Sequence, residues 1–227
     1  MNSRVLEFDS LVTSRRAVRA FLPTPVPKTL ISEILDIARL APSNSNIQPW
    51  NVHVLTGEPK QALSALLMAA HNDPHSEQLT HFPSDLGQRY RQRQELFGAL
   101  FYGLHQVDKC DTGARARVSG LNFEFFGAPV GLIFTIDSNL KKYSWVDYGI
   151  FLQTLMLSAQ ARGLATCPQV SFARFQNLIG DFLHLDDGQE IVCGMSLGYA
   201  DDNALLNSLR MPRAPTEELA RFIGFDQ

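Results

Sequence analysis

The sequence is poor in cysteine and lysine, and it has no long apolar run. Its three cysteines, Cys110, Cys167 and Cys193, are an odd number without a close pair, which favours free thiols in a reducing compartment. No window reaches about 18 uninterrupted apolar residues, so we expect no membrane span. The first residues also lack the apolar stretch of a signal peptide. These absences predict a cytoplasmic protein that folds without disulfides.

Motifs of several common chemistries are missing as well. There is no P-loop and no dinucleotide-binding glycine fingerprint after a strand, which argues against phosphoryl transfer and a Rossmann-type NAD site. We also predict no serine nucleophile elbow, which needs a glycine-flanked serine on a sharp turn from a strand into a helix. His71 and His75 have helical spacing, but Pro74 breaks the helix that would bring them together, so we predict no metal site. Cys167 has no adjacent base and is expected to be a small buried hydrophobe.

The length and charge limit the class of protein further. A chain of 227 residues suits a single domain. Its net charge of −3, from 20 basic and 23 acidic residues, argues against nucleic acid as a partner. Only five of the basic residues are lysine, so 15 are arginine. Arginine is preferred where a planar fork must hold a phosphate or carboxylate, so its distribution becomes informative.

Hydrophobic periodicity predicts an alternation of helices and strands. The predicted helices cover residues 5–14, 27–41, 59–70, 145–162 and 172–183. The predicted strands cover residues 51–57, 130–136 and 190–199, and residues 164–168 are a candidate for a fourth. Residues 145–162 are apolar almost all round, so we expect a central helix covered on every side. Residues 71–118 predict a loop and two polar helices, a peripheral excursion from the same domain.

Arginines gather in two short segments at opposite ends of the chain. Arg15, Arg16 and Arg19 repel one another unless an anion lies between them, although a solvated basic turn is the alternative. Arg210 and Arg213 lie in a proline-bounded tail. A phosphate held by both segments would use bidentate geometry well, but spacing alone does not show that they meet.

The third signal is the polar loop of residues 41–50. Its serine and asparagine side chains can donate to carbonyls and ring heteroatoms. Helix termination and turn chemistry explain most of the same composition.

Taken together, these segments resemble the FMN-dependent nitroreductase family. Residues 14–21 are similar to its Arg-Arg-Ser-x-Arg-x-Phe motif, with Ala17 where the family usually has serine. Residues 41–50 are similar to its Ala-Pro-Ser-x-x-Asn-x-Gln-Pro-Trp loop. Further similarities follow in family order at residues 122–129, 163–169 and 209–213. The resemblance spans nearly the whole chain and is weakest over residues 71–118.

The resemblance implies an α/β (α+β) sandwich with a central mixed, largely antiparallel sheet flanked by helices. It implies one FMN-binding domain over residues 1–227, with a helical lid at about 71–118 and a C-terminal arm at about 204–227. It also implies an intertwined homodimer with two FMN sites at the interface. The apolar helix 145–162 then fits the core of the dimer.

The resemblance also assigns roles to residues. Arg15 and Arg210 are expected to grip the FMN phosphate, Arg19 to lie near the pyrimidine edge of the flavin, and the 41–50 loop to reach FMN from the partner subunit. The expected cofactor-binding residues are Arg15, Arg16, Ala17, Arg19, Pro42, Ser43, Asn44, Asn46, Gln169, Val170, Ser171, Arg210 and Arg213. Candidate acceptor contacts are Tyr90, Phe101, Tyr102 and Phe123, which core packing explains equally well.

The implied reaction is a ping-pong hydride transfer from NADH or NADPH, through FMN, to a nitroaromatic, a quinone or a similar electron-poor small molecule. The flavin carries the chemistry, so no protein acid or base is predicted to be essential. Two alternatives stay open. The same fold also serves ene-reductases, reductive dehalogenases and flavin-processing enzymes, and a flavin-binding protein with little turnover would share these motifs.

Overall fold

The computed structural model describes residues 3–76, 78–80, 83 and 85–225. Its centre is a four-stranded sheet in the order β1-β2-β4-β3, formed by β1 (Asn51–Thr56), β2 (Val130–Asp137), β3 (Ala165–Gln169) and β4 (Gln189–Gly198). All three strand pairs are antiparallel, and a single parallel bridge joins Ala17 to Thr166 at the β3 edge. The predicted strands and the largely antiparallel sheet are therefore confirmed.

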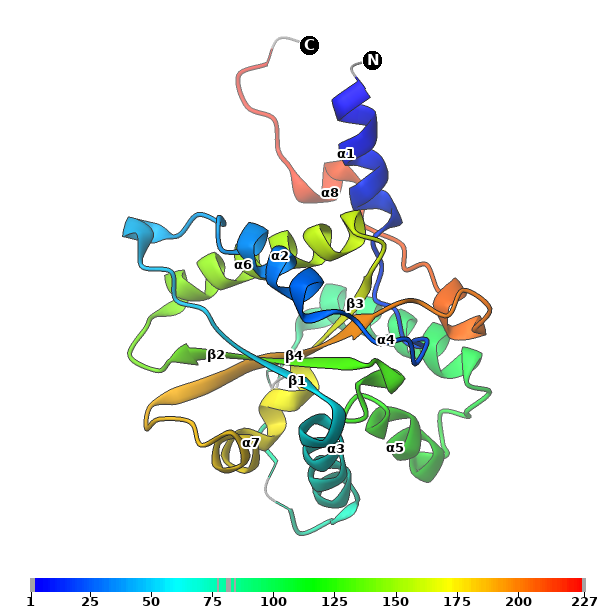
Figure 1. The fold of residues 1–227 in the computed structure, drawn as a ribbon. Helices are drawn as coiled ribbons and strands as arrows, with labels where there is room; N and C mark the ends of the chain where they lie inside the picture. Colours follow the sequence, from blue (N-terminus) through cyan, green and yellow to red (C-terminus); the bar gives the residue numbers. More distant parts are fainter. Residues whose placement is uncertain (1–2, 77, 81–82, 84, 226–227) are drawn as a thin grey trace.

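One face of the sheet is covered by α2 (Lys28–Ala38) and α6 (Lys142–Ala161), as Figure 1 shows. Strand side chains alternate between the two faces, so Leu132, Phe134 and Ile136 of β2 all pack on this side. On α2 the apolar residues recur at helical spacing, and Ile31 and Ile34 are buried against the same cluster.

The opposite face is covered by α3 (Gly57–Asn72), α5 (Thr112–Gly120) and α7 (Gln176–Leu183) (Figure 1). A cluster of phenylalanine rings fills the space between these helices and the sheet. The Phe123 ring packs edge-on against Phe172 and Phe175, with centroids 5.6 and 5.1 Å apart, and Phe125 lies 4.8 Å from Phe172. All four rings are buried, which places one of the two main cores on this side.

Two strand glycines make room for these rings. A methyl group added at Gly194 in β4 would lie 2.5 Å from the ring of Phe172, and one at Gly131 in β2 would lie 2.5 Å from Phe125. Both distances are well inside van der Waals contact. The close approach of ring and sheet therefore requires glycine at both positions.

Replacement of Gly194 by alanine should consequently destabilise the fold. We expect Gly194→Ala to lower the free energy of unfolding by roughly 1–3 kcal/mol, because the methyl group forces Phe172 out of a close-packed layer. The matched control is Gly180→Ala in α7, where no atom lies within 4 Å of the added methyl group and helix propensity favours alanine. Urea unfolding followed by circular dichroism, at one protein concentration, measures both. Equal stability of Gly194→Ala and the wild type would contradict this packing account.

The first and last described segments of the chain lie on the α6 side, beyond the layered body (Figure 1). Helix α1 (Ser3–Ser14) has no buried residue, and Val5, Leu6 and Phe8 are exposed. After it, the chain runs along the β3 edge. The tail contains η4 (Leu205–Ser208) and the short helix α8 (Thr216–Leu219), and several of its apolar side chains are exposed.

Of three expectations about individual elements, one is confirmed and two need adjustment. Residues 71–118 contain the end of α3, then α4 (Gly87–Leu104) and α5, so two helices are present as predicted. The predicted helix 172–183 instead begins as a 3₁₀ segment, η3 (Val170–Phe175), and becomes α-helical only in α7. The expectation that the 145–162 helix is covered on every side is wrong for a single chain. Trp145, Val146 and Ile150 of α6 are 39–61% exposed.

Among the described residues, no helix combines the length and apolarity needed to cross a bilayer. The described ranges also contain no group of three or more histidine, cysteine or acidic side chains that could bind a metal ion.

Candidate functional site

The N-terminal arginine segment is fixed against the edge strand β3. The backbone N–H of Val18 donates to the carbonyl of Thr166 at 3.0 Å, and the N–H of Leu22 donates to the carbonyl of Tyr199 at 2.9 Å. Val18 itself is buried in the core. The backbone that carries Arg15 and Arg19 is therefore held rigidly at the edge of the sheet.

A buried asparagine joins this segment to the tail. Asn207 is 3% exposed, and its side-chain oxygen accepts from the N–H of Arg19 at 2.8 Å. Its amide nitrogen donates to the carbonyls of Ala20 and Asp201, at 2.7 and 2.9 Å. A polar group this deeply buried needs all of these partners, so Asn207 ties together segments nearly 190 residues apart. The arginine segments from the two chain ends do meet.

Three arginines of this site lack an acidic partner. Burial lowers the pKa of Arg15, and the nearby positive charge of Arg213 lowers it further. Arg19 lies with its guanidinium carbon 5.0 Å from the ring centroid of Phe101. Within the described ranges, no carboxylate forms an ion pair with any of the three arginines. Like charges held together in this way are stabilised by a bound anion.

The structure assigns different roles to two other predicted arginines. Arg16 donates to the carbonyl of Asn207 at 3.0 Å and forms an ion pair with Asp202 at 3.2 Å, so its guanidinium anchors the tail. Arg210 donates to the carbonyls of Asn207 and Leu209 at 2.9 and 3.1 Å. The tail arginine whose charge acts on Arg15 is Arg213. The expected grip of Arg15 and Arg210 on a phosphate stays a prediction, and Arg213 is a further candidate because its charge reaches Arg15.

The segment that follows β3 offers main-chain groups and one orphaned hydroxyl. The Gln169 side chain is occupied, because its amide donates to the carbonyl of Asn122 at 2.6 Å and accepts from Ser196 at 2.8 Å. Only its backbone remains for a ligand, so a side-chain contact to a cofactor is not expected. Val170 is half-exposed, and the buried hydroxyl of Ser171 has no hydrogen-bond partner among the described residues. A ligand at this point would find an open donor.

The polar loop before β1 has an unusual backbone. Ser45, Asn46 and Gln48 have φ values of 52°, 58° and 49°, in the left-handed region that side chains other than glycine rarely adopt. Each such residue costs on the order of 1–3 kcal/mol, and such strain clusters at functional sites. The Ser43 hydroxyl, which accepts from the N–H of Gln48 at 3.0 Å, helps to hold the loop in shape.

The loop is anchored to the beginning of α6. The Asn44 N–H donates to the buried carboxylate of Asp147 at 3.1 Å. The side chains of Asn44 and Pro42 are exposed. The Trp50 ring, at the end of the loop, stacks on Phe151 with centroids 4.8 Å apart.

In one chain this loop and the arginine cluster do not form a common site. Ser14, next to Arg15, accepts from Gln160 near the end of α6, thirteen residues after Asp147. At 1.5 Å per residue, the two contacts are about 20 Å apart along the helix. No hydrogen bond or ion pair among the described residues joins the loop to the cluster. The predicted site residues therefore lie in two separate groups.

The four predicted acceptor contacts have different surroundings. Phe123 is 0% exposed within the phenylalanine core, so its prediction as an acceptor contact is corrected to a core role. Phe101 is buried between His105 and Arg19, whereas Tyr90 is 58% exposed on α4. The Tyr102 ring lies 3.8 Å from the guanidinium carbon of Arg115. Of Tyr90, Phe101 and Tyr102, it is Phe101 that lies against the arginine cluster.

Sequence reasoning missed several residues of the site. No local sequence pattern marks Asn207, Asp147 or Phe97. A single polar or aromatic residue in a helix or tail can serve packing, hydrogen bonding or binding, and the sequence does not distinguish them. His105 is the most informative omission. Its Nε2 is buried without a hydrogen-bond partner in the described part of the chain, and burial together with the charge of Arg19 lowers its pKa. A neutral, unpartnered imidazole therefore lies close to the cluster.

Cys167 lies next to the cluster but is not a nucleophile. Burial raises the pKa of its thiol to about 11, although the charges of Arg19 and Arg15 act in the opposite direction. The thiol is therefore protonated at neutral pH, as the expectation of a buried small hydrophobe requires.

A cavity of about 710 Å³ adjoins the cluster, between α4 and the tail. It is lined by Arg213 and Phe97 together with other residues of both segments. Since Phe97 also lies under the Arg19 guanidinium, at 5.4 Å, the cavity opens next to the arginines. Its size falls within the range of small-molecule sites.

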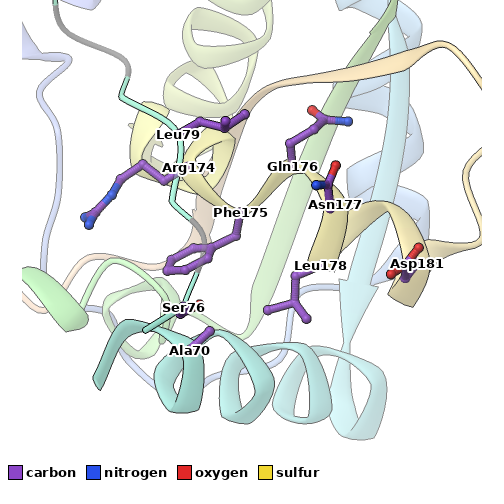
Figure 2. Close-up of a pocket in the computed structure, with 9 residues that line it drawn as sticks. All are labelled: Ala70, Ser76, Leu79, Arg174, Phe175, Gln176, Asn177, Leu178 and Asp181. Atoms are coloured by element: carbon purple, nitrogen blue, oxygen red, sulfur yellow. The ribbon is translucent and has the colours of Figure 1, made fainter. Parts of the chain in front are cut away.

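Figure 2 shows a smaller cavity, of about 230 Å³, on the α3–α7 side of the sheet. Phe175 and Leu178 project from η3 and α7 toward Ala70 of α3, and the Arg174 side chain extends away from Asp181 (Figure 2). Arg174 is engaged by the Gln78 side chain, and its carbonyl accepts from the N–H of Leu79 at 2.9 Å. This cavity shares no lining residue with the arginine cluster.

The fold defines a class first: an α+β protein with a largely antiparallel sheet, whose β3 edge carries arginines that have no acidic partner among the described residues. The solved structure of the FMN-dependent nitroreductase NfnB from Mycobacterium smegmatis, in complex with NADPH, matches with a TM-score of 0.91 at 32% identity. That match covers 97% of this chain and 100% of the other. The fold is thus that of a known FMN-dependent nitroreductase.

The sequence comparisons give the same result. The family model described as the nitroreductase family matches residues 12–199, and the chain belongs to that family. A 4-nitrobenzoate reductase from Pseudomonas putida is 75% identical over 97% of both chains. A nitrobenzene nitroreductase from Ectopseudomonas oleovorans is 37% identical over 95% of this chain and 96% of the other.

Proposed function

We propose that this protein is an NAD(P)H-dependent FMN oxidoreductase that reduces nitroaromatic acceptors, including nitrobenzoates. The observation that carries the proposal is the cluster of Arg15, Arg19 and Arg213, three guanidinium groups with no acidic partner among the described residues. Membership of the nitroreductase family and similarity to a 4-nitrobenzoate reductase support the choice of cofactor and acceptor. The free cysteines agree with a reducing, cytoplasmic location.

The residues present fit FMN. Arg15 and Arg213 would hold the phosphate between them, and the phosphate would offset the burial and the like charge that lower the pKa of Arg15. The main-chain N–H groups near Val170 and Ser171 would supply donors for the polar edge of the flavin ring. Ala17 leaves only backbone contacts at its position.

When bound, FMN supplies the redox chemistry by taking a hydride from NAD(P)H and passing it to the acceptor. Arg19 would supply a positive charge to the bound flavin, and its contacts with the rings of Phe97 and Phe101 keep that charge in one position. His105 offers an imidazole nitrogen nearby that is neutral at pH 7. The protein's part is therefore to bind and orient FMN and to tune its charge. No side chain is required as an essential acid or base.

We further propose that the complete site is shared between two copies of the chain. The strained loop with Pro42, Ser43 and Asn46 lies about 20 Å along α6 from the arginines of its own chain. A two-fold-related copy would bring its loop to this site. Such a second copy would also bury the exposed apolar side chains of α1, α6 and the tail. They include Val5, Leu6, Phe8, Val12, Trp145, Val146, Ile150, Leu219, Phe222, Ile223 and Phe225.

Residues 71–118, with the tail from about 204 onward, would then form the cover of the acceptor site. Helix α4 contacts both the N-terminal arginine segment and the tail, through Arg19 on Phe101 and through Arg93 with Glu218 at 2.8 Å. This supports the roles of lid and arm within one domain. The acceptor contacts that remain as proposals are Tyr90, Phe101 and Tyr102.

NADPH oxidation measured with and without acceptors tests the proposal. We expect slow oxidation of NADPH alone and rapid oxidation after addition of 4-nitrobenzoate or nitrobenzene, with a quinone as a further acceptor. Reduction of activated alkenes but not of nitro compounds would favour an ene-reductase on the same fold. Stoichiometric FMN without turnover of any acceptor would favour a flavin-binding protein.

A further inference from the structure

The 710 Å³ cavity has a positively charged wall. The residues of α4 that line it, Arg89, Gln92, Arg93, Leu96 and Phe97, recur at helical spacing and form one face of the helix. The opposite wall is the tail, from Met211 to Leu219. Among the described residues, Glu218 is the one carboxylate of the lining.

The two α4 arginines compete for that single carboxylate. Arg93 and Arg89 reach the same oxygen, Oε2 of Glu218, at 2.8 and 3.4 Å. Arg89 also donates to the main-chain carbonyl of Glu218 at 3.1 Å. One negative charge neutralises one guanidinium, so a positive charge remains even when Arg213 is compensated by the FMN phosphate. All three side chains are about half-exposed, and ion pairs of this kind are weak and easily exchanged.

The rest of the lining is apolar. Leu96, Phe97, Met211, Pro212 and Leu219 surround the space next to the arginines. A ligand that matches such a cavity combines a flat apolar body with an anionic group at one end. Arginine suits a carboxylate in particular, because its planar fork forms two parallel hydrogen bonds with the two oxygens.

We propose that Arg93, assisted by Arg89, binds the carboxylate of aromatic acid acceptors and thereby makes nitrobenzoates better acceptors than neutral nitroaromatics. This inference rests on the proposed function, since it names the residues that select the acceptor at that site. Glu218 acts as a competing internal carboxylate that holds the arginines in place when the acceptor is absent.

The test compares two acceptors of similar shape in three variants. For each variant, kcat/KM is measured with 4-nitrobenzoate and with nitrobenzene, and their ratio is the readout. We expect Arg93→Gln to lower the ratio roughly 10-fold or more, because it removes a charge-assisted bidentate contact. Glu218→Gln should raise the ratio, because it removes the competing anion. General damage to the site would not improve selectivity, so the opposite signs identify the mechanism.

Arg91→Gln is the matched control. Arg91 lies on the same helix but outside the cavity lining, and it pairs with Asp85 at 3.7 Å. Its substitution should leave the ratio unchanged. An equal loss in Arg91→Gln and Arg93→Gln would show that only the overall charge of α4 matters, and it would overturn the inference.

A binding measurement separates this inference from the proposed function. Titration calorimetry of the FMN-loaded protein with benzoate, which cannot be reduced at a nitro group, should show weaker binding in Arg93→Gln and tighter binding in Glu218→Gln. If benzoate behaves in this way while no nitro compound is turned over, the inference stands and the proposed reaction fails.

The same experiments can show instead that the arginines bind a phosphate group, either of FMN or of NADPH. If Arg93→Gln weakens FMN binding, or if it lowers kcat/KM for NADPH but not for NADH, the arginines serve a phosphate and the inference is wrong. Unchanged acceptor ratio and unchanged benzoate affinity in Arg93→Gln would overturn it as well.

Discussion

Arg213→Gln is expected to weaken FMN binding roughly 10- to 100-fold. The reason is the loss of a charge-assisted contact to the phosphate, which contributes about 1.5–3 kcal/mol. Arg213 is the tail arginine whose charge lowers the pKa of Arg15, so both are positioned for one anion. The dissociation constant can be measured from flavin fluorescence during titration of the apoprotein. The fold should stay intact, because the Arg213 guanidinium donates only to carbonyls of its own segment, at 3.0 and 3.4 Å.

Two further variants test whether the loss of FMN affinity is specific to Arg213. Arg210→Gln should have a smaller effect on FMN affinity, because the tail charge that acts on Arg15 is that of Arg213. Arg39→Gln is a neutral control, since Arg39 pairs with Asp36 on exposed surface at the end of α2. A greater loss of FMN affinity in Arg210→Gln than in Arg213→Gln would restore the pairing expected from the sequence.

Val146→Asp is expected to convert the protein into a monomer that has lost most of its FMN. Val146 is 61% exposed in the single chain, so the substitution leaves the fold of one subunit intact. In a two-fold interface, however, two uncompensated carboxylates would be buried, at a cost of several kcal/mol. Size-exclusion chromatography with light scattering measures the mass, and the flavin-to-protein absorbance ratio measures retained FMN.

The matched control is Ala65→Asp, on an exposed position of α3 across the sheet from α6. This variant should remain dimeric and yellow. A Val146→Asp protein that is monomeric yet keeps FMN with wild-type affinity would refute the shared site, and an undisturbed dimer would show that α6 lies outside the interface.

The sequence predicted the sheet well because its strands are buried apolar runs between turns. Strand β2 was expected at 130–136 and spans Val130–Asp137, and its alternating contacts follow directly from the strand period. The beginning of α6 was placed three residues late, because Lys142, Tyr143 and Ser144 add no apolar signal. The η3 segment was mistaken for an α-helix. Phe172 and Phe175 are three residues apart, a spacing that suits both helix types.

The site was predicted only in part, since contacts between distant segments leave little trace in a sequence. The arginine segments were recognisable, but which tail arginine acts on Arg15 depends on the path of the tail in space, which the sequence does not show. Phe123 was a reasonable acceptor contact until its ring proved to be fully buried. Asn207 holds both segments together, yet a lone asparagine in a polar tail gives no sign of that role.

The visible spectrum of the purified protein during one anaerobic cycle tests the central claim most directly. The account predicts a yellow protein with one FMN per chain, whose flavin absorption is bleached by NADPH and restored by a stoichiometric addition of 4-nitrobenzoate. A colourless protein that takes up no added FMN would contradict the account, as would a flavin that NADPH reduces but 4-nitrobenzoate cannot reoxidise.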